Sequence, residues 1–331
     1  MRLTIVLLLV AVALPAAAQP ATLRIATVAP DGTSWARELH AWGRDVEAAS
    51  QGELRIKIYF GGIAGSEEEL LPRIRREQLD GAIGSEICTQ LSPSLKVARV
   101  IGVFQSREEN AFILSRLKST LDQEFLRAGF INLGEAGLGP ELLFTREPVA
   151  DLNALRKLRL WVWSSDAVLP PQARALGLTV VQTPLEQAGR AFDEHQVDGF
   201  ITIPTAALAF QWTTQVRYVT ELRVSFRSGC LIVATHAFDA LGLDAQRAIK
   251  SSVGKLNQRI EELGRREDAA LLSGLLARQG MRVLPASELL RSQFFDIART
   301  SRPGNRIVSQ EIMQRVLSWL ADYRAEHEAT R

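Results

Sequence analysis

The stretch that decides the fold is DLNALRKLRLWVWSSDAVLPPQARALGLTVVQTPLEQAGRAFDEHQVDGFITIP, residues 151–204. Three short runs in it have strand character: 158–163, 178–183 and 197–203. The two segments between them carry prolines near the start of a helix, and a glycine follows the first of these helices. Strand, helix, strand, helix, strand at this spacing predicts a parallel sheet. Such sheets bind ligands at the carboxyl ends of their strands.

The first of these strands has two different faces. Arg159, Trp161 and Trp163 alternate with aliphatic residues, so they share one side of the strand. A guanidinium can bind a carboxylate with two hydrogen bonds, and the rings can hold an apolar ligand body. The alternative is a strand edge with Arg159 in solvent and the tryptophans packed under a helix. This strand alone favours neither interpretation.

The pattern occurs a second time near the N-terminus. Strands are predicted at 22–28, 54–60 and 80–85, with helices from 34 to 50 and from 66 to 77. With 331 residues, the chain is long enough for two domains. We therefore predict a two-lobed α/β fold of two βαβ-built lobes joined by a hinge, with a long helix from 238 to about 279 spanning both. The predicted lobes are 22–143 with 232–275, and 144–231 with 276–331.

Residues 1–18 have the features of a cleaved signal peptide. Arg2 precedes an apolar run from 3 to 14, Pro15 breaks it, and Ala16 to Ala18 form a small-residue cleavage site. The apolar run is shorter than the roughly 20 residues of a membrane span. We therefore expect cleavage after Ala18 and a soluble protein in the periplasm.

Composition excludes several other function classes. The net charge of +2 and the interspersed charges give no indication of a nucleic-acid partner. The four histidines lack zinc-ligand spacing, and no catalytic or cofactor motif is present, so we predict neither an enzyme nor a bound cofactor or metal. Export permits a disulfide between Cys88 and Cys230, but their separation does not establish one. Two buried free thiols are the expectation, with the disulfide as the alternative.

Several segments in order resemble one known family. ATVAPDGTSW at 26–35, GELRIKIYF at 52–60, PVADLNALRKLRLWV at 148–162 and VDGFITIP at 197–204 resemble the periplasmic solute-binding proteins of TRAP transporters, the DctP family. The resemblance covers nearly the whole mature chain. It implies two lobes that close over a ligand, and a membrane transporter driven by an ion gradient as the partner.

The resemblance also assigns a role to Arg159. The family has a nearly constant arginine in a K-I-R-V strand that pairs with the ligand carboxylate, and we match this strand to Lys157–Leu160. The family has a polar or basic ligand contact in the segment that here reads PELLFTRE, at 140–147, and is mostly apolar. Its polar residues after V-D-G are replaced here by Phe200, Ile201 and Thr202. The loss of hydrogen-bonding groups and the gain of tryptophans predict an organic acid with a hydrophobic or aromatic body.

Other contacts are weaker candidates. Besides Phe200 and Thr202, we expect Trp212, Trp35, Thr33 and Glu86 to reach the ligand. For each of these four a structural role is the alternative: ring packing, a helix cap or a solvated carboxylate. The alternative function is a carrier or sensor of lipids or other hydrophobic ligands that works without a TRAP permease. We expect a monomer in either case.

Overall fold

One mixed sheet organises the whole molecule. The computed structural model describes residues 20–304 and 306–328, and its strands follow the order β2-β1-β3-β8-β4-β7-β5-β6, with β9 paired to β8. The strands are β1 (Ala21–Ala26), β2 (Leu54–Tyr59), β3 (Gly81–Gly84), β4 (Phe130–Thr145), β5 (Arg159–Trp163), β6 (Thr179–Thr183), β7 (Gly199–Thr202), β8 (Tyr218–Ala234) and β9 (Arg282–Leu284). The predicted signal peptide lies outside the described residues.

Each end of the sheet is a parallel unit, as the two βαβαβ patterns predict. β1 pairs in parallel with β2 and β3, and β5 pairs in parallel with β6 and β7. The crossovers are α1 (Ser34–Ala49), α2 (Glu67–Arg75), α6 (Leu169–Ala175) and α7 (Ala188–Asp193). Local signals start the first two, because Thr33 caps α1 and Ser66 with Glu69 forms a capping box on α2.

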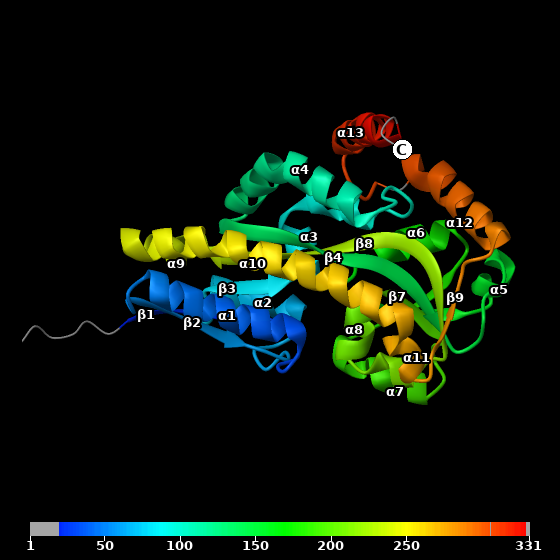
Figure 1. Cartoon of the computed structure of the whole chain (residues 1–331), viewed down its shortest axis with the longest axis horizontal. Coiled ribbons are helices and arrows are strands. Elements are labelled where there is room, and N and C mark those ends of the chain that lie inside the picture. Colours follow the sequence, from blue (N-terminus) through cyan, green and yellow to red (C-terminus); the bar gives the residue numbers. More distant parts are fainter. Residues whose placement is uncertain (1–19, 305, 329–331) are drawn as a thin grey trace, which may run out of the picture.

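Two long antiparallel strands join the two parallel units. β4 and β8 pair from Phe130 with Ala234 to Thr145 with Tyr218, and run through the middle of the molecule (Figure 1). β3 pairs with the last residues of β8, and β7 pairs with the last residues of β4. Each lobe is therefore built on a different end of the same two-stranded ribbon.

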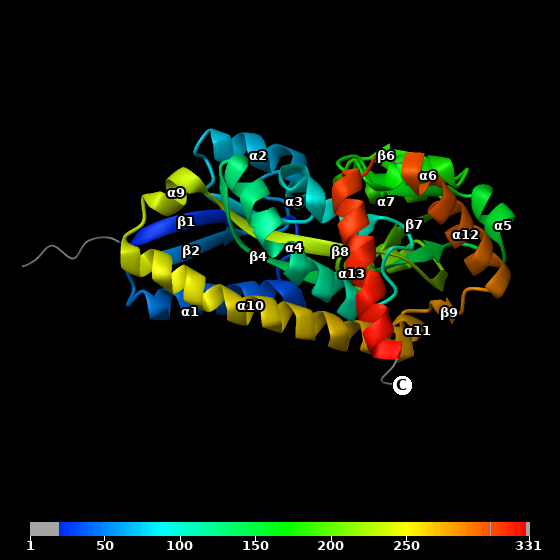
Figure 2. The same ribbon diagram turned by 90° about the horizontal axis from the view of Figure 1, so that it is seen from above.

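A long helix follows this ribbon along the molecule. α10 (Leu243–Ala270) packs against α1 and β4 and reaches α8 (Pro204–Ala209) in the second lobe. Its 28 residues give it a length of about 42 Å, and Figures 1 and 2 show it running alongside the first lobe and ending against the second. The shorter helices are α3 (Glu86–Leu91), α5 (Leu152–Arg156), α9 (Thr235–Asp239) and α11 (Leu276–Arg278).

The C-terminal helix corrects the predicted division of the chain. α12 (Glu288–Ser301) packs against α5 and α6 of the second lobe. α13 (Gln310–Glu328) instead lies against α4 (Arg107–Arg127), and its buried residues Ile312, Val316 and Leu320 belong to the core of the first lobe (Figure 2). Sequence analysis placed everything after 276 in the second lobe. An amphipathic stripe shows that a helix has a buried face, but not which core covers it.

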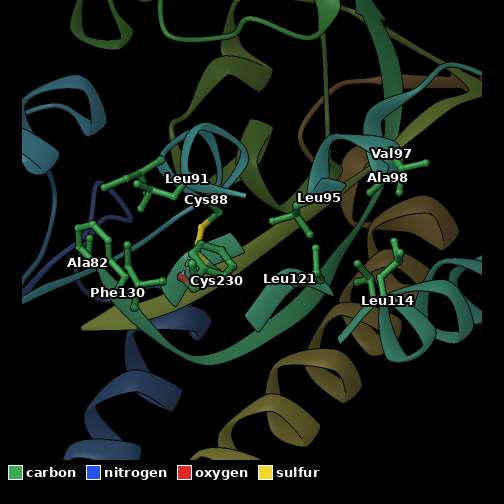
Figure 3. Packing of buried hydrophobic residues seen from close by; sticks show 14 of the residues in the cluster. Ala82, Cys88, Leu91, Leu95, Val97, Ala98, Leu114, Leu121, Phe130 and Cys230 are labelled. Atoms are coloured by element: carbon green, nitrogen blue, oxygen red, sulfur yellow. Dashed lines mark hydrogen bonds between the residues drawn. A yellow bond between two sulfur atoms is a disulfide. The ribbon is translucent and has the colours of Figure 1, made fainter. Parts of the chain in front are cut away.

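The two cysteines form a disulfide, so the expectation of free thiols is wrong. Cys88 of α3 is bonded to Cys230 of β8, across 142 residues of sequence. Figure 3 shows the bond among apolar side chains that include Ala82, Leu91 and Phe130. The separation along the chain carried no information about distance, since Cys230 comes beside Cys88 only because β8 pairs with β3, the strand before α3.

Replacing both cysteines with serine should lower the free energy of unfolding by about 2 to 5 kcal/mol, because the unfolded chain gains the freedom of a long open loop. Urea unfolding of the wild type and of the Cys88→Ser, Cys230→Ser double variant measures the difference. Reductant should shift the wild type toward the variant and leave the variant unchanged. Equal midpoints without reductant would contradict the prediction.

No helix in the described ranges is long and apolar enough to cross a bilayer.

Candidate functional site

A cavity lies between the two lobes, where the carboxyl ends of the parallel strands face each other. It encloses about 170 Å³. Val28 and Trp35 contribute from the first lobe, Trp163 and Phe210 from the second, and Ile260 from the long helix α10. The position agrees with the rule that open α/β sheets bind ligands at the carboxyl ends of their strands.

Aromatic rings line the cavity from both lobes, and more of them come from the second lobe. Trp161, Trp163, Phe210 and Trp212 line the cavity on this side, and Trp35 lines it from the other. The ring of Trp212 lies 4.8 Å from that of Trp161 and 5.1 Å from that of Phe210, measured between centroids. Trp161 is also fixed by its Nε1–H, which donates to Thr183 Oγ1 at 2.7 Å. These rings offer a pre-formed apolar surface to a ligand.

The strand pattern explains why the rings gather here. Leu160 and Val162 of β5 pack in one core cluster, whereas Trp161 belongs to another and Trp163 packs against it. β7 ends at Thr202, which lines the cavity, and Pro204 starts α8 directly beyond. Phe200, two residues earlier, is fully buried. It contacts the ring of Trp212 at 5.5 Å, so it supports the wall without lining the cavity.

The structure does not bring Arg159 to this cavity. Arg159 begins β5, four residues or about 13 Å before Trp163. Its Nε and Nη2 donate to the two carboxylate oxygens of Asp198, at 3.0 and 2.9 Å, and its side chain is 44% exposed. The face prediction was right for the two tryptophans. The arginine shares their face but lies at the opposite end of the strand, where it pairs with the aspartate that precedes β7.

Two further predicted contacts also lie outside the lining. Thr33 caps α1: its Oγ1 accepts from Ala36 N and donates to the carbonyl of Pro30. Glu86 is buried behind the cavity in a group of charged side chains. Trp35, Trp161, Trp163, Thr202 and Trp212 are the predicted residues that the structure brings together around the cavity.

A buried charge cluster lies beside the cavity and joins the two lobes. We use this name for Arg99, Arg227, Glu86, Glu141 and Asp166. Arg99, at the end of a 3₁₀ helix (Pro93–Arg99), is 2% exposed and donates to Glu86 at 2.9 Å, Glu141 at 3.2 Å and Asp166 at 2.6 Å. Arg227 of β8 donates to Glu86 at 2.6 Å and to Glu141 at 2.7 Å. Asp166 and Arg227 also line the cavity.

Sequence analysis missed this cluster except for Glu86. Its members come from five separate segments, and Glu141 lies in a run that read as mostly apolar. The available signal was the position of Glu141 and Arg227 inside long apolar strands, where charges are rare unless they are paired. That signal does not identify the residues with which these two charges pair.

Burial and charge shift the acids of the cluster in opposite directions. Burial raises the pKa of Glu86 to about 7, and Asp166 and Glu67 add to the rise against the pull of Arg99 and Arg227. Burial also opposes ionisation of Glu141, but Arg227 and Arg99 hold the pKa of Glu141 below its usual value. Glu86 Oε2 has no hydrogen-bond partner among the described groups.

Glu86 should make stability depend on pH. Its pKa is 4.5 unfolded and about 7 folded, so the native state binds more protons between these values. The wild type should therefore lose stability, relative to Glu86→Gln, as pH rises from about 4.5 to about 7. Chemical unfolding of both proteins at several pH values measures this difference. A difference that does not change with pH would contradict the assignment.

The arrangement is suited to enclosing a molecule. Ser164 Oγ of the second lobe donates to Glu68 Oε1 of the first at 2.7 Å, so the lobes also touch beside the cavity. In the part of the chain that the structure describes, no group of three or more histidine, cysteine, aspartate or glutamate side chains is placed to hold a metal ion.

Comparison with known proteins adds a family and a fold. The family model DctP, described as bacterial extracellular solute-binding protein, family 7, matches residues 25–301. No curated protein sequence matches the chain at a significant level.

Three solved structures share the fold at low sequence identity. A TRAP periplasmic solute-binding protein from Haemophilus influenzae, with bound L-gulonate, has a TM-score of 0.83 at 15% identity and covers 89% of this chain and 98% of its own. A Bordetella pertussis extracytoplasmic solute receptor that binds pyroglutamic acid has a TM-score of 0.82 at 19% identity, covering 90% and 98%. A TRAP protein from Roseobacter denitrificans with L-galactonate has 0.82 at 18%, covering 91% and 98%.

Proposed function

Because the chain belongs to the DctP family of bacterial extracellular solute-binding proteins, family 7, we propose that it captures a small organic acid with a hydrophobic or aromatic body between its lobes. It delivers this solute to a TRAP-type membrane transporter. The observation that carries the proposal is the interlobe cavity with five aromatic side chains in its lining, Trp35, Trp161, Trp163, Phe210 and Trp212.

The lining supports an apolar ligand body. Apart from the tryptophans it is rich in aliphatic side chains, including Leu39, Ile83, Leu138 and Ile260. Burying apolar ligand surface against them contributes about 25 cal/mol per Å². The polyhydroxylated gulonate and galactonate of the structural neighbours would leave many hydroxyl groups without partners on such walls.

The size of the cavity supports a small solute. A volume of about 170 Å³ suits a single ring with a short chain. The structural neighbours bind gulonate, pyroglutamic acid and galactonate, which are also small molecules.

No observation favours the alternative of a lipid carrier without a permease. The acids bound by the structural neighbours support the carboxylate that sequence analysis predicts for the ligand, but Arg159 pairs with Asp198 and lies outside the cavity lining.

A thermal-shift screen tests the proposal. Aromatic and short aliphatic compounds should raise the melting temperature more than sugar acids of equal size, because ligand binding to the native state stabilises it by mass action. Uptake of the best compound should then require this protein together with the membrane subunits. Stabilisation by sugar acids alone would contradict the apolar site.

A further inference from the structure

We propose that Arg227 receives the acid group of the ligand in this cavity, and that Glu86 takes up a proton as the ligand binds. The inference rests on the proposed function, since it names the residue that holds the acid and the residue that responds to it. It makes Arg227 a ligand contact and Glu86 a positioning residue that acts through Arg227. Capture of the acid is then coupled to pH.

Arg227 is the cation that the cavity offers to an acid. Among the residues that the structure describes, it is the only arginine or lysine in the lining, and its side chain is 13% exposed. The neighbouring Arg99 is absent from the lining and 2% exposed. A carboxylate that leaves water for this apolar cavity needs a charged partner, and only Arg227 is placed to provide one.

The guanidinium of Arg227 keeps one donor for a ligand. Its Nε and Nη2 each donate once to Glu141 Oε1, at 2.9 and 2.7 Å. Its Nη1 donates to Glu86 Oε1 at 2.6 Å and to Ser85 Oγ at 3.4 Å. A guanidinium has five N–H groups, two of them on Nη2. The second N–H of Nη2 therefore remains for an oxygen of the ligand carboxylate.

The acids around Arg227 oppose an anion unless one of them is neutral. The charged groups around Glu86 come from five separate segments: Glu67 of α2, Arg99 of the 3₁₀ helix, Glu141 of β4, Asp166 between β5 and α6, and Arg227 of β8. With Glu86 they make four carboxyl groups against two guanidiniums. If all four were ionised, the ligand would add its charge to a site that is already negative.

Two of these acids keep their charge. Burial opposes the ionisation of both Glu141 and Asp166, but the two arginines hold the pKa of each below its ordinary value. Glu67 accepts hydrogen bonds from the backbone N–H groups of Ser85 and Ile87, and such bonds favour its ionised form. A proton is therefore least compatible with the surroundings of these three carboxyl groups.

Glu86 is the group that can take the proton. It touches Arg227 directly, and its Oε2 has no hydrogen-bond partner among the described groups, so a proton there breaks no existing bond. Burial raises its pKa to about 7 before any ligand is present. A carboxylate at Arg227 is a nearby like charge, which raises the pKa of Glu86 further. Ligand and proton thus favour each other, and the acid binds less tightly as pH rises above about 7.

Calorimetry with two matched pairs of compounds tests the coupling. The pairs are 3-phenylpropanoate with 3-phenylpropanamide and hexanoate with hexanamide, and both acids stay ionised because ordinary carboxyl groups titrate near about pH 4. From pH 7 to 8.5 the affinity of the wild type for the acids should fall by about fivefold or more, while its affinity for the amides should stay constant. Titration at pH 8 in phosphate and in Tris, which differ in heat of ionisation, should show uptake of about half a proton or more for each acid bound and none for the amides.

The outcomes separate this inference from the proposed function. Binding of the acids with a constant affinity and no proton uptake would overturn the inference and leave the proposed function standing. An equal pH dependence for acids and amides would also overturn it. Failure of all four compounds to bind would contradict the proposed function and the inference with it.

Glu86→Gln tests the source of the proton effect. This variant should still bind the acids, but without pH dependence and without proton uptake. Glu109→Gln is the matched control, because Glu109 is a buried glutamate paired with Arg324 outside the cavity, and it should keep the pH dependence of the wild type. An undiminished pH dependence in Glu86→Gln would remove Glu86 from this role.

Arg227→Gln tests the contact with the acid. It should lower the ratio of acid affinity to amide affinity by about tenfold or more, because the charge-assisted hydrogen bond is lost. Arg107→Gln is the matched control: Arg107 is 16% exposed and pairs with Asp268 outside the cavity, so the ratio should not change. An unchanged ratio in a folded Arg227→Gln protein would show that the acid binds elsewhere. If that variant does not fold, the wild type and Glu86→Gln still decide the inference.

Discussion

Replacing Arg99 with leucine should lower the free energy of unfolding by about 3 to 5 kcal/mol, because it leaves buried carboxylates without their partner. Arg99 is fully enclosed and holds Glu86, Glu141 and Asp166 together. Without it, Arg227 alone faces these three acids, and they must either stay charged without a sufficient partner or take up protons. Denaturant unfolding at pH 7.5 measures the loss.

Arg159→Leu is the matched control for this substitution. Arg159 also pairs with an aspartate through two hydrogen bonds, but its side chain is 44% exposed, so water replaces the lost partner. It should change stability little and leave ligand affinity unchanged. The loss in Arg99→Leu should also shrink as pH falls and the orphaned carboxylates become protonated. An Arg99→Leu protein as stable as Arg159→Leu would contradict the role of the charge cluster.

Trp161→Ala should weaken binding of the best apolar ligand at least 30-fold, which corresponds to about 2 kcal/mol. Trp161 lines the cavity, contacts the ring of Trp212 and is held by Thr183. Its removal deletes one wall of the site and lets water reach the ligand. Calorimetry at a temperature where the variant is folded measures the affinity. Because the cavity becomes larger, a ligand with an additional ring should lose less affinity than the best wild-type ligand.

Trp42→Ala separates binding from folding. Trp42 is likewise a buried tryptophan whose Nε1–H donates to a hydroxyl, Ser252 Oγ at 3.1 Å, but it lies outside the cavity. Both substitutions should destabilise the fold by about 3 to 5 kcal/mol. Only Trp161→Ala should reduce affinity. Equal losses of affinity in the two variants would show that the ring of Trp161 acts through the fold alone.

The sequence was sufficient for the parts of the fold that depend on local pattern. Proline, glycine and alternating apolar residues between 151 and 204 predict the strands β5, β6 and β7 and their parallel direction. The structure confirms both. The same holds for β1, β2 and β3. The lobe against which α13 packs could not be predicted, because its apolar stripe could pack against either lobe.

The sequence likewise predicted some residues of the candidate site and misplaced others. Alternation along β5 correctly placed Trp161 and Trp163 on one face, but a face does not specify which end of the strand a ligand meets. Trp161 lines the cavity, whereas Arg159, two residues earlier on the same face, does not.

The charge cluster could not be predicted because only the folded chain assembles it. Its pairs span 13 residues between Glu86 and Arg99, and 141 between Glu86 and Arg227. No local rule connects residues at these separations, and interspersed charges in a sequence usually indicate a solvated surface. Four of its side chains are buried, and Asp166 and Arg227 line the cavity, which is what identifies the cluster as part of the site.

The most direct test of the apolar receptor is native mass spectrometry of the protein purified from the periplasm, followed by extraction and identification of the bound compound. We predict a small molecule with an aromatic or aliphatic body. A bound sugar acid or a small dicarboxylate would contradict it, because either would require polar partners that the aromatic walls of this cavity do not provide.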